Sequence, residues 1–171
     1  MMIIGDGGHA SVIKELLEQY EIGWFGYKDA VVAVGDNAAR KKEAQANSFQ
    51  RFPPLISNKA IVSKSAFIGE GTVIMPGAII AANAKIGCFC IVNHGATVDH
   101  DCVIGDYVNI APGAHLCGHV EVGEGSLVGV GVGIAPMCKI PAWTLVKARK
   151  LEMEPLYARE QDFAQWEKIS L

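Results

Sequence analysis

Histidine supplies most of the titratable chemistry that this chain can offer near neutral pH. The 171 residues hold five histidines, at positions 9, 94, 100, 115 and 119. A neutral imidazole can accept a proton from a reacting group or ligate a metal ion. A solvent-exposed or structural role is the alternative for each of them. His100 differs from the others by its neighbours, because it lies between the carboxylates of Asp99 and Asp101.

A glycine-rich turn near the N-terminus has residue types that suit a phosphate group. Residues 1–4 are apolar, the turn Gly5-Asp6-Gly7-Gly8-His9 follows, and residues 10–20 show helical spacing of apolar side chains. In nucleotide-binding βα units, flexible backbone at a helix start lies close to phosphate. A second strand is expected over 30–34. We therefore predict a small Rossmann-like βα module over residues 1–50, with a plain strand-to-helix turn or a docking cap as alternatives.

An unbroken six-residue repeat fills the middle of the chain. Fifteen aliphatic residues, from Val62 to Val146, follow one another at a spacing of six. The last residue of most blocks is small, and glycine follows the aliphatic residue at 69, 87, 105, 123 and 129. Neither a helix nor a simple strand has this period. It is typical of a parallel β-helix, in which each block gives one short strand and one turn.

Three blocks close one triangular coil, so residues 51–146 predict a mainly β domain of about five coils. The aliphatic residue would point inward and stack on its equivalents three blocks away, and the small residue would fit the corner. We expect the glycines to supply turn dihedrals that a Cβ would forbid. A β-sandwich is the alternative. Residues 147–171 are charged with interspersed apolar residues, which predicts a C-terminal helical cap on the last coil.

Composition excludes several classes of protein. The formal net charge of −3 offers no basic face for phosphates, so we expect no nucleic-acid partner. No apolar run is long enough for a membrane span, and the N-terminus lacks the regions of a signal peptide, so the expected compartment is the cytoplasm. The five cysteines form no Cys-x-x-Cys pair, which indicates reduced, mostly buried thiols rather than a zinc or redox motif.

A resemblance to a known family rests on the repeat and on three stretches: IIGDGGHASVIKELLE, VVAVGDNAARKK and NHGATVDHDCVIGDYVNIAPGAHLCGHVEVGEGSLVGVG. Together they resemble the bacterial hexapeptide-repeat sugar acetyltransferases, which include sialic acid O-acetyltransferases and UDP-amino-sugar N-acetyltransferases. The resemblance covers most of residues 1–19 and 30–146. It implies a left-handed parallel β-helix, a homotrimer, and acetyl transfer from acetyl-CoA to an amine or hydroxyl of a sugar or nucleotide-sugar, in surface polysaccharide or glycan precursor biosynthesis.

The resemblance also implies catalytic roles. His100 matches the general base of the family, and Asp101, with Asp99 as the second choice, matches the carboxylate that fixes its tautomer. Gly118 lies three blocks after His100 and is expected one coil above it. Its amide would stabilise the developing oxyanion.

Binding residues follow in the same way. Acetyl-CoA would lie in the groove between two solenoids and contact Asn109, Gly118, Pro136 and Lys139, although many relatives have histidine in place of Asn109. A nucleotide would meet Gly7, Gly8 and His9, opposite Gly35, Asp36 and Asn37. The turn residues Asn93 and His94 would touch the acceptor.

Other functions stay open. A metal-dependent hydratase of the γ-carbonic anhydrase kind needs three imidazoles, two of them usually five residues apart. Here the gaps are six (94–100) and four (115–119), so we predict no metal. The remaining alternatives are a serine or other small-molecule O-acetyltransferase and a non-catalytic β-helix assembly subunit. A different acyl donor, such as succinyl-CoA, is also compatible with the sequence.

Overall fold

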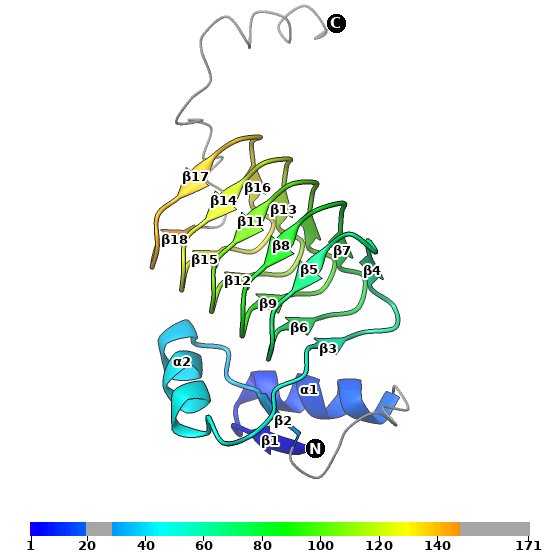
Figure 1. Ribbon diagram of the computed structural model, residues 1–171, viewed down its shortest axis with the longest axis vertical. Coiled ribbons are helices and arrows are strands. Elements are labelled where there is room, and N and C mark those ends of the chain that lie inside the picture. Colours follow the sequence, from blue (N-terminus) through cyan, green and yellow to red (C-terminus); the bar gives the residue numbers. More distant parts are fainter. Residues whose placement is uncertain (20–28, 148–171) are drawn as a thin grey trace, which may run out of the picture.

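The N-terminal segment forms two strands and two helices at one end of a stack of short strands (Figure 1). This computed structural model describes residues 1–19 and 29–147. The segment contains β1 (Met2–Ile4), α1 (Gly8–Gln19), β2 (Ala30–Val32) and α2 (Asn37–Ala46). Strands β1 and β2 pair in parallel, so the predicted order of strand, glycine-rich turn, helix and strand is confirmed.

Helix α1 packs through one apolar face. Ala10, Ile13 and Leu16 are buried, and they share a core cluster with Val73 and Met75 from the first coils of the stack. This spacing of three residues is the helical periodicity seen in the sequence. The N-terminal segment is therefore joined to the stack by a continuous hydrophobic core.

Every strand of the stack is two residues long. They are β3 (Leu55–Ile56), β4 (Ile61–Val62), β5 (Phe67–Ile68), β6 (Val73–Ile74), β7 (Ile79–Ile80), β8 (Lys85–Ile86), β9 (Ile91–Val92), β10 (Thr97–Val98), β11 (Val103–Ile104), β12 (Asn109–Ile110), β13 (His115–Leu116), β14 (Glu121–Val122), β15 (Leu127–Val128), β16 (Gly133–Ile134), β17 (Lys139–Ile140) and β18 (Leu145–Val146).

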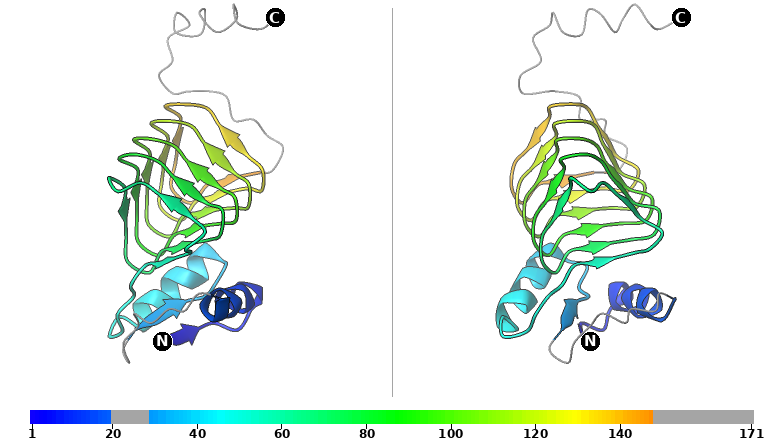
Figure 2. Two further views of the ribbon diagram at one scale, coloured as in Figure 1. Left: turned by 90° about the vertical axis from the view of Figure 1, so that its right-hand side faces the viewer. Right: turned by 45° about the vertical axis from the view of Figure 1, so that its right-hand side comes forward.

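Successive strands lie in three different parallel sheets, so the chain winds through triangular coils (Figure 2). The sheets have the orders β16-β13-β10-β7-β4, β17-β14-β11-β8-β5 and β18-β15-β12-β9-β6-β3. Paired residues are 18 apart, as Asn109 shows by pairing with Ile91 and Leu127. The fold is a parallel β-solenoid of about five coils.

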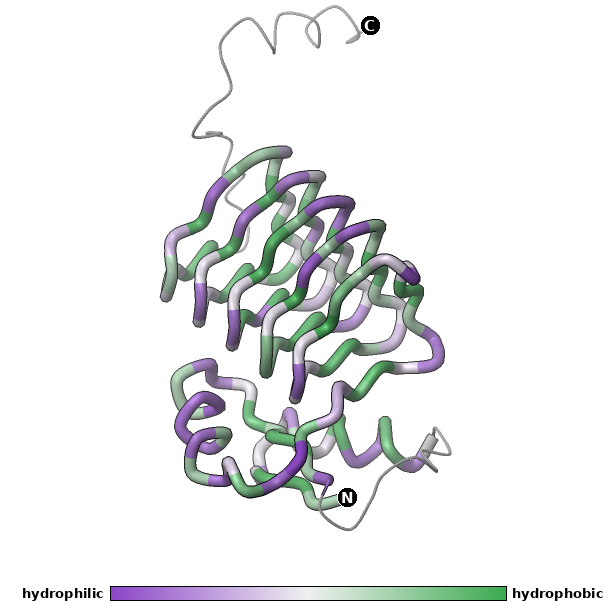
Figure 3. The backbone as a smooth tube through the Cα atoms, in the orientation of Figure 1, coloured by the Kyte–Doolittle hydropathy of each residue, from purple (hydrophilic) through white to green (hydrophobic). Residues whose placement is uncertain are grey.

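The aliphatic residues at the second position of the blocks fill the solenoid. Ile74, Val92, Ile110 and Val128 are fully buried along one side, and most of the small sixth-position residues are buried at the corners. Figure 3 shows hydrophobic colour recurring along the strands and hydrophilic colour at many of the turns. The predicted direction of these side chains is confirmed.

Left-handed backbone recurs at the fifth position of every block from residue 67 onward. Glycine holds this position in part of the blocks, but seven other residues adopt it with φ from 53° to 60°: Asn83, Phe89, Asp101, Tyr107, His119, Met137 and Trp143. Non-glycine residues pay a conformational cost in this region, which the packed corner must offset. The corner therefore fixes the direction of the side chains that it carries.

The glycines after the aliphatic residue serve a purpose other than the predicted one. Gly69, Gly87, Gly105 and Gly123 do not have positive φ. A Cβ on Gly87 would lie 2.7 Å from the carbonyl carbon of Gly105 in the next coil. Our expectation of special turn dihedrals was wrong at these positions, because glycine is needed there for close contact between coils.

A buried arginine fixes the N-terminal segment against the solenoid. Arg40 on α2 is only 1% exposed. Its Nε donates to the carbonyl of Phe89 at 2.8 Å, and Nη2 donates to that of Tyr107 at 2.8 Å. Its Nη1 donates to the carbonyls of Val34 and Gly35, both at 3.0 Å. Burial lowers the pKa of Arg40 to about 10, so it stays charged at neutral pH.

Within the described ranges, none of the helices has the length and apolarity needed to cross a membrane. The predicted C-terminal helical cap falls on residues 147–171, which lie outside the described part apart from Lys147.

Candidate active site

His100, Gly118 and Pro136 follow one another at intervals of three blocks along one edge of the solenoid. This line, called here the His100 edge, separates the sheet that contains β10 from the sheet that contains β11. Backbone hydrogen bonds join neighbouring coils along this edge. The N–H of His119, for example, donates to the carbonyl of His100 at 3.0 Å. The predicted stacking of Gly118 on His100 is therefore a consequence of the strand register.

The imidazole of His100 is oriented by a carboxylate. Its Nδ1 lies 2.9 Å from Oδ2 of Asp101. Because an ionised carboxylate only accepts, Nδ1 carries the hydrogen and Nε2 keeps a free lone pair. This hydrogen bond raises the pKa of His100 and lowers the pKa of Asp101. Asp99, the second choice, instead accepts the backbone N–H of His100 at 2.7 Å and so shapes the turn.

Gly118 lies against the His100 ring. A Cβ built on Gly118 would be 2.7 Å from Nε2 of His100 and 2.6 Å from Cε1. The amides at the equivalent positions, those of His94 and His100, donate to the side chains of Asn93 and Asp99. Within the described residues the amide of Gly118 has no such partner. Gly118, whose amide makes no such bond among the described residues, thus lies beside Nε2 of the imidazole.

His119 also lies at this site, although the sequence analysis assigned it no role, and its side chain is exposed as expected of a surface residue. Its Nε2 lies 3.8 Å from Oδ2 of Asp101, and its ring meets that of His100 edge-on with centroids 5.3 Å apart. The signal was available, because position 119 comes three blocks after position 101. The same period that located Gly118 also locates His119.

The residues expected to contact acetyl-CoA lie in two separate regions of the chain. Pro136 is exposed on the His100 edge, and Lys139 begins β17 three residues later, where it forms an ion pair with Glu121 at 2.8 Å. Lys139 also lines a cavity of about 180 Å³. Asn109 lies on β12 in a different sheet, and its Nδ2 is 3.4 Å from the carbonyl of Gly35. Within one chain it belongs to the side that faces the N-terminal segment.

The glycine-rich turn encloses a cavity of about 330 Å³. Its lining comprises Gly5, Asp6, Gly7, Gly8, His9, Ala33, Val34 and Gly35. The cavity lies where β1 and β2 end and α1 begins, so amides at the start of α1 are close by. A Cβ on Gly7 or Gly8 would meet nothing within 4 Å, which leaves the backbone open to a ligand.

Two buried polar atoms near the contact between the N-terminal segment and the solenoid have no hydrogen-bond partner in the described part of the chain. They are Nε2 of His9 and Oδ1 of Asn109. Burial, with smaller contributions from Arg40 and His94, lowers the pKa of His9 to about 4. His9 is therefore neutral at pH 7, and both atoms are available to a ligand or a water molecule.

Asp36 and Asn37 are occupied by structural contacts. Asp36 caps α2, with its Oδ1 accepting the N–H of Ala39 at 2.8 Å. Asn37 donates from Nδ2 to the carbonyls of Gly125 and Ser126 at 3.0 and 3.1 Å, which ties α2 to the solenoid. Both residues also line a cavity of about 240 Å³ together with Trp143 and Leu145.

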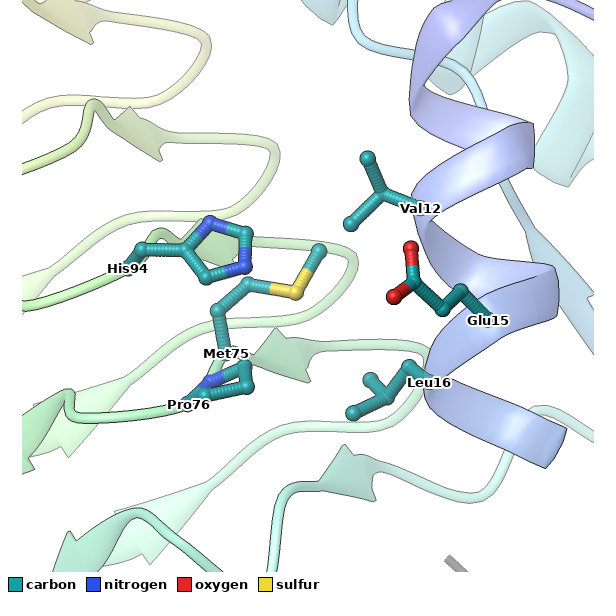
Figure 4. Close-up of a pocket in the computed structure, with 6 residues that line it drawn as sticks. All are labelled: Val12, Glu15, Leu16, Met75, Pro76 and His94. Carbon is teal, nitrogen blue, oxygen red and sulfur yellow. The ribbon is translucent and has the colours of Figure 1, made fainter. Parts of the chain in front are cut away.

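Asn93 and His94 lie on a different edge from His100, between the sheets of β9 and β10. Oδ1 of Asn93 is 2.8 Å from Nδ1 of His94. Figure 4 shows His94 and Met75 facing Glu15 and neighbouring residues of α1 across a small cavity of about 90 Å³. The acceptor residues predicted from the sequence thus gather near the N-terminal segment, and strand β10 separates them from His100.

Comparisons with known proteins agree with this architecture. The sequence pattern of the family described as bacterial transferase hexapeptide (six repeats) matches residues 83–116. GDP-perosamine N-acetyltransferase of Escherichia coli O157:H7 is 32% identical, over 60% of this chain and 48% of that protein. The chain spans about half the length of the curated relatives that it matches.

Solved structures match over a larger share. PerB from Caulobacter crescentus, in complex with CoA and GDP-perosamine, is 33% identical with a TM-score of 0.80 and covers 86% of this chain and 85% of its own. The acetyltransferase domain of PglB from Neisseria gonorrhoeae, in complex with acetyl coenzyme A, is 31% identical with a TM-score of 0.79 and covers 86% and 87%. The chain therefore belongs to the bacterial hexapeptide-repeat family that contains these sugar acetyltransferases.

Proposed function

We propose that this chain transfers an acetyl group from acetyl-CoA to an amino or hydroxyl group of a sugar, and that the acceptor is a nucleotide-linked amino sugar. The observation that carries the proposal is the His100 arrangement. Asp101 holds Nδ1, Nε2 keeps its lone pair, and Gly118 lies beside the ring. The relatives named with CoA and a nucleotide sugar support the choice of substrates.

In the proposed reaction, Nε2 of His100 takes the proton from the acceptor as its nitrogen or oxygen attacks the thioester carbonyl. The amide of Gly118 donates to the oxygen on which negative charge develops. Asp101 supports the imidazolium that forms. When the carbon–sulfur bond breaks, His100 returns the proton to the sulfur. Acetylated sugar and free CoA are the products.

The donor and acceptor are proposed to bind from different sides. Asn109, Gly118, Pro136 and Lys139 would contact acetyl-CoA in the groove between two solenoids. The cavity of Gly7, Gly8, His9 and Gly35 would take the nucleotide, with Asn93 and His94 on the acceptor side. Asp36 would shape this region by capping α2, and Asn37 would do so by bonding α2 to the solenoid.

This division supports the proposal of a homotrimer. Within one chain, the acceptor residues near α1 and the base His100 lie on different edges of the triangle. A second copy that brings its N-terminal segment to the His100 edge would complete the site, and three-fold symmetry would close the assembly. Light scattering should then give three times the mass of one chain, and a stable monomer would contradict this part of the proposal. Left-handed winding of the coils and the boundaries 1–50, 51–146 and 147–171 remain part of the same proposal.

The direct experiment is a panel of acceptors with acetyl-CoA. GDP- and UDP-linked 4-amino sugars, their free amino sugars and serine would each be incubated with the protein, and products identified by mass spectrometry. We expect acetylation of a nucleotide-linked amino sugar at a rate at least tenfold above that of serine. Acetylation of serine alone, or of no compound in the panel, would contradict the proposal.

A further inference from the structure

His100, Asp101 and His119 offer three metal-binding atoms that all lie within 4.8 Å of one another. The proposed acetyl transfer uses His100 and Asp101 but gives His119 no part. All three residues keep solvent access, with side-chain exposures of 51%, 38% and 58%. In the single chain, a cation can therefore reach the cluster from solution.

We propose that this cluster binds a divalent cation with the ligand preference of Zn²⁺, and that an occupied site inactivates the general base. Zn²⁺ takes histidine nitrogen and carboxylate oxygen, and three protein ligands leave a fourth position for water. Tetrahedral bonds of about 2.1 Å place ligand atoms about 3.4 Å apart. The separations from Oδ2 of Asp101, 2.9 Å to His100 and 3.8 Å to His119, lie on either side of that value.

The scaffold holds the ligands in place without a metal. Asp101 and His119 occupy left-handed corner positions one coil apart, with φ of 58° and 59°. Nδ2 of Asn83 donates to Oδ1 of Asp101 at 3.1 Å. The other carboxylate oxygen, Oδ2, is the one that lies near the two imidazoles. Partners that orient a carboxylate in this way are typical of metal sites and raise affinity.

Occupancy changes the tautomer of His100. A metal ion on Nδ1 replaces the hydrogen that Asp101 accepts, and the single hydrogen of the neutral ring then lies on Nε2. An Nε2–H cannot take a proton from the acceptor. Binding of the cation does not depend on the proposed function, whereas the loss of activity rests on it.

The binding test uses the full chain after chelator treatment, with Zn²⁺ followed by calorimetry and Co²⁺ by its visible spectrum. We expect one ion per chain, and binding at least tenfold weaker in His119→Gln. His115→Gln is the matched control, because His115 is an exposed histidine that faces Thr97 rather than the cluster. Cys117→Ser tests the exposed thiol nearby. Both controls should bind like the unmodified protein. No binding by the unmodified chain, or equal binding by His119→Gln, would overturn the proposal.

The activity test measures acetylated sugar by mass spectrometry, because the thiol of free CoA also binds zinc. We expect Zn²⁺ to reduce the rate at least tenfold and chelator to restore it. The rate of His119→Gln, compared with and without Zn²⁺, should be unchanged by the metal ion. If the binding results hold but no acetyl transfer occurs, the proposed function fails and the cation site stands. If Zn²⁺ inhibits His119→Gln as strongly as the unmodified enzyme, the inhibitory role is wrong.

Discussion

Gly118 lies so close to His100 that a Cβ at position 118 would be 2.7 Å from Nε2 of the imidazole. The two residues are three blocks apart in sequence and meet because three blocks make up each coil of the solenoid. The absence of a side chain at position 118 thus leaves space beside Nε2 of the proposed base.

Gly118→Ala should reduce kcat at least tenfold, because the methyl group displaces the His100 ring from its hydrogen bond with Asp101. Steady-state kinetics with the best acceptor measures this. Gly131→Ala is the control, since a Cβ there meets nothing within 4 Å and only its left-handed φ of 66° adds a cost, about 1 kcal/mol. Equal kcat in the two variants would show that position 118 is not next to the reaction.

Asp101→Asn should reduce kcat about 10- to 100-fold without loss of fold, because an amide no longer secures the Nδ1–H tautomer of His100. Asp99→Asn is the matched control. In the preceding block, Asn93 already accepts the N–H of the next residue, as Asp99 does for His100, so an asparagine can keep this turn. A larger loss of kcat in Asp99→Asn than in Asp101→Asn would reverse the two assignments.

Arg40→Met should lower the free energy of unfolding by about 3 kcal/mol or more, because buried carbonyls of Phe89 and Tyr107 would lose their donor. Urea unfolding at pH 7 measures the change. Lys41→Met, on the same helix, removes a partly exposed ion pair with Glu124 and the contacts of the ammonium with the rings of Tyr107 and Trp143, and should lower the midpoint much less than Arg40→Met. Similar midpoints for both variants would mean that Arg40 does not join the N-terminal segment to the solenoid.

The free energy of unfolding should decrease as the pH is lowered, because His9 binds a proton more readily in the unfolded chain. Its pKa is about 4 in the folded chain and 6.5 in the unfolded chain, so only the unfolded state binds the proton between these values. Unfolding therefore becomes easier as pH decreases from about 6.5 to 4, by up to about 3 kcal/mol. His9→Gln should have a flatter dependence in urea titrations at pH 7, 6 and 5. Parallel curves for the two proteins would contradict a buried, neutral His9.

The repeat made much of the fold predictable. Aliphatic residues such as Ile74 and Val92 recur every six positions, and that spacing alone fixes the inward side chain, the coil length and the neighbour of His100. In a solenoid, the same repeat determines where each strand forms and which residues of neighbouring coils contact each other. For this reason, contacts between distant residues could be obtained by counting three blocks along the chain.

Contacts outside the repeat could not be obtained in this way. Arg40 lies in a charged helical run that resembles a solvated face, yet its guanidinium bonds to carbonyls 49 and 67 residues away. Nothing in the order of residues relates α2 to these corners. In the same way, the position of Asn109 beside Gly35 depends on how the N-terminal segment packs on the sheet of β12.

Whether His100 is the general base of an acetyl transfer can be decided by the single-turnover rate of His100→Ala. The measurement would use saturating acetyl-CoA and the acceptor found in the panel, with chelator present and circular dichroism to confirm folding. We predict a rate at least 10²-fold below that of the unmodified protein, in line with the range of about 10²–10⁴ for a general base. A folded His100→Ala variant that acetylates the acceptor at a rate within twofold of the unmodified protein would contradict it.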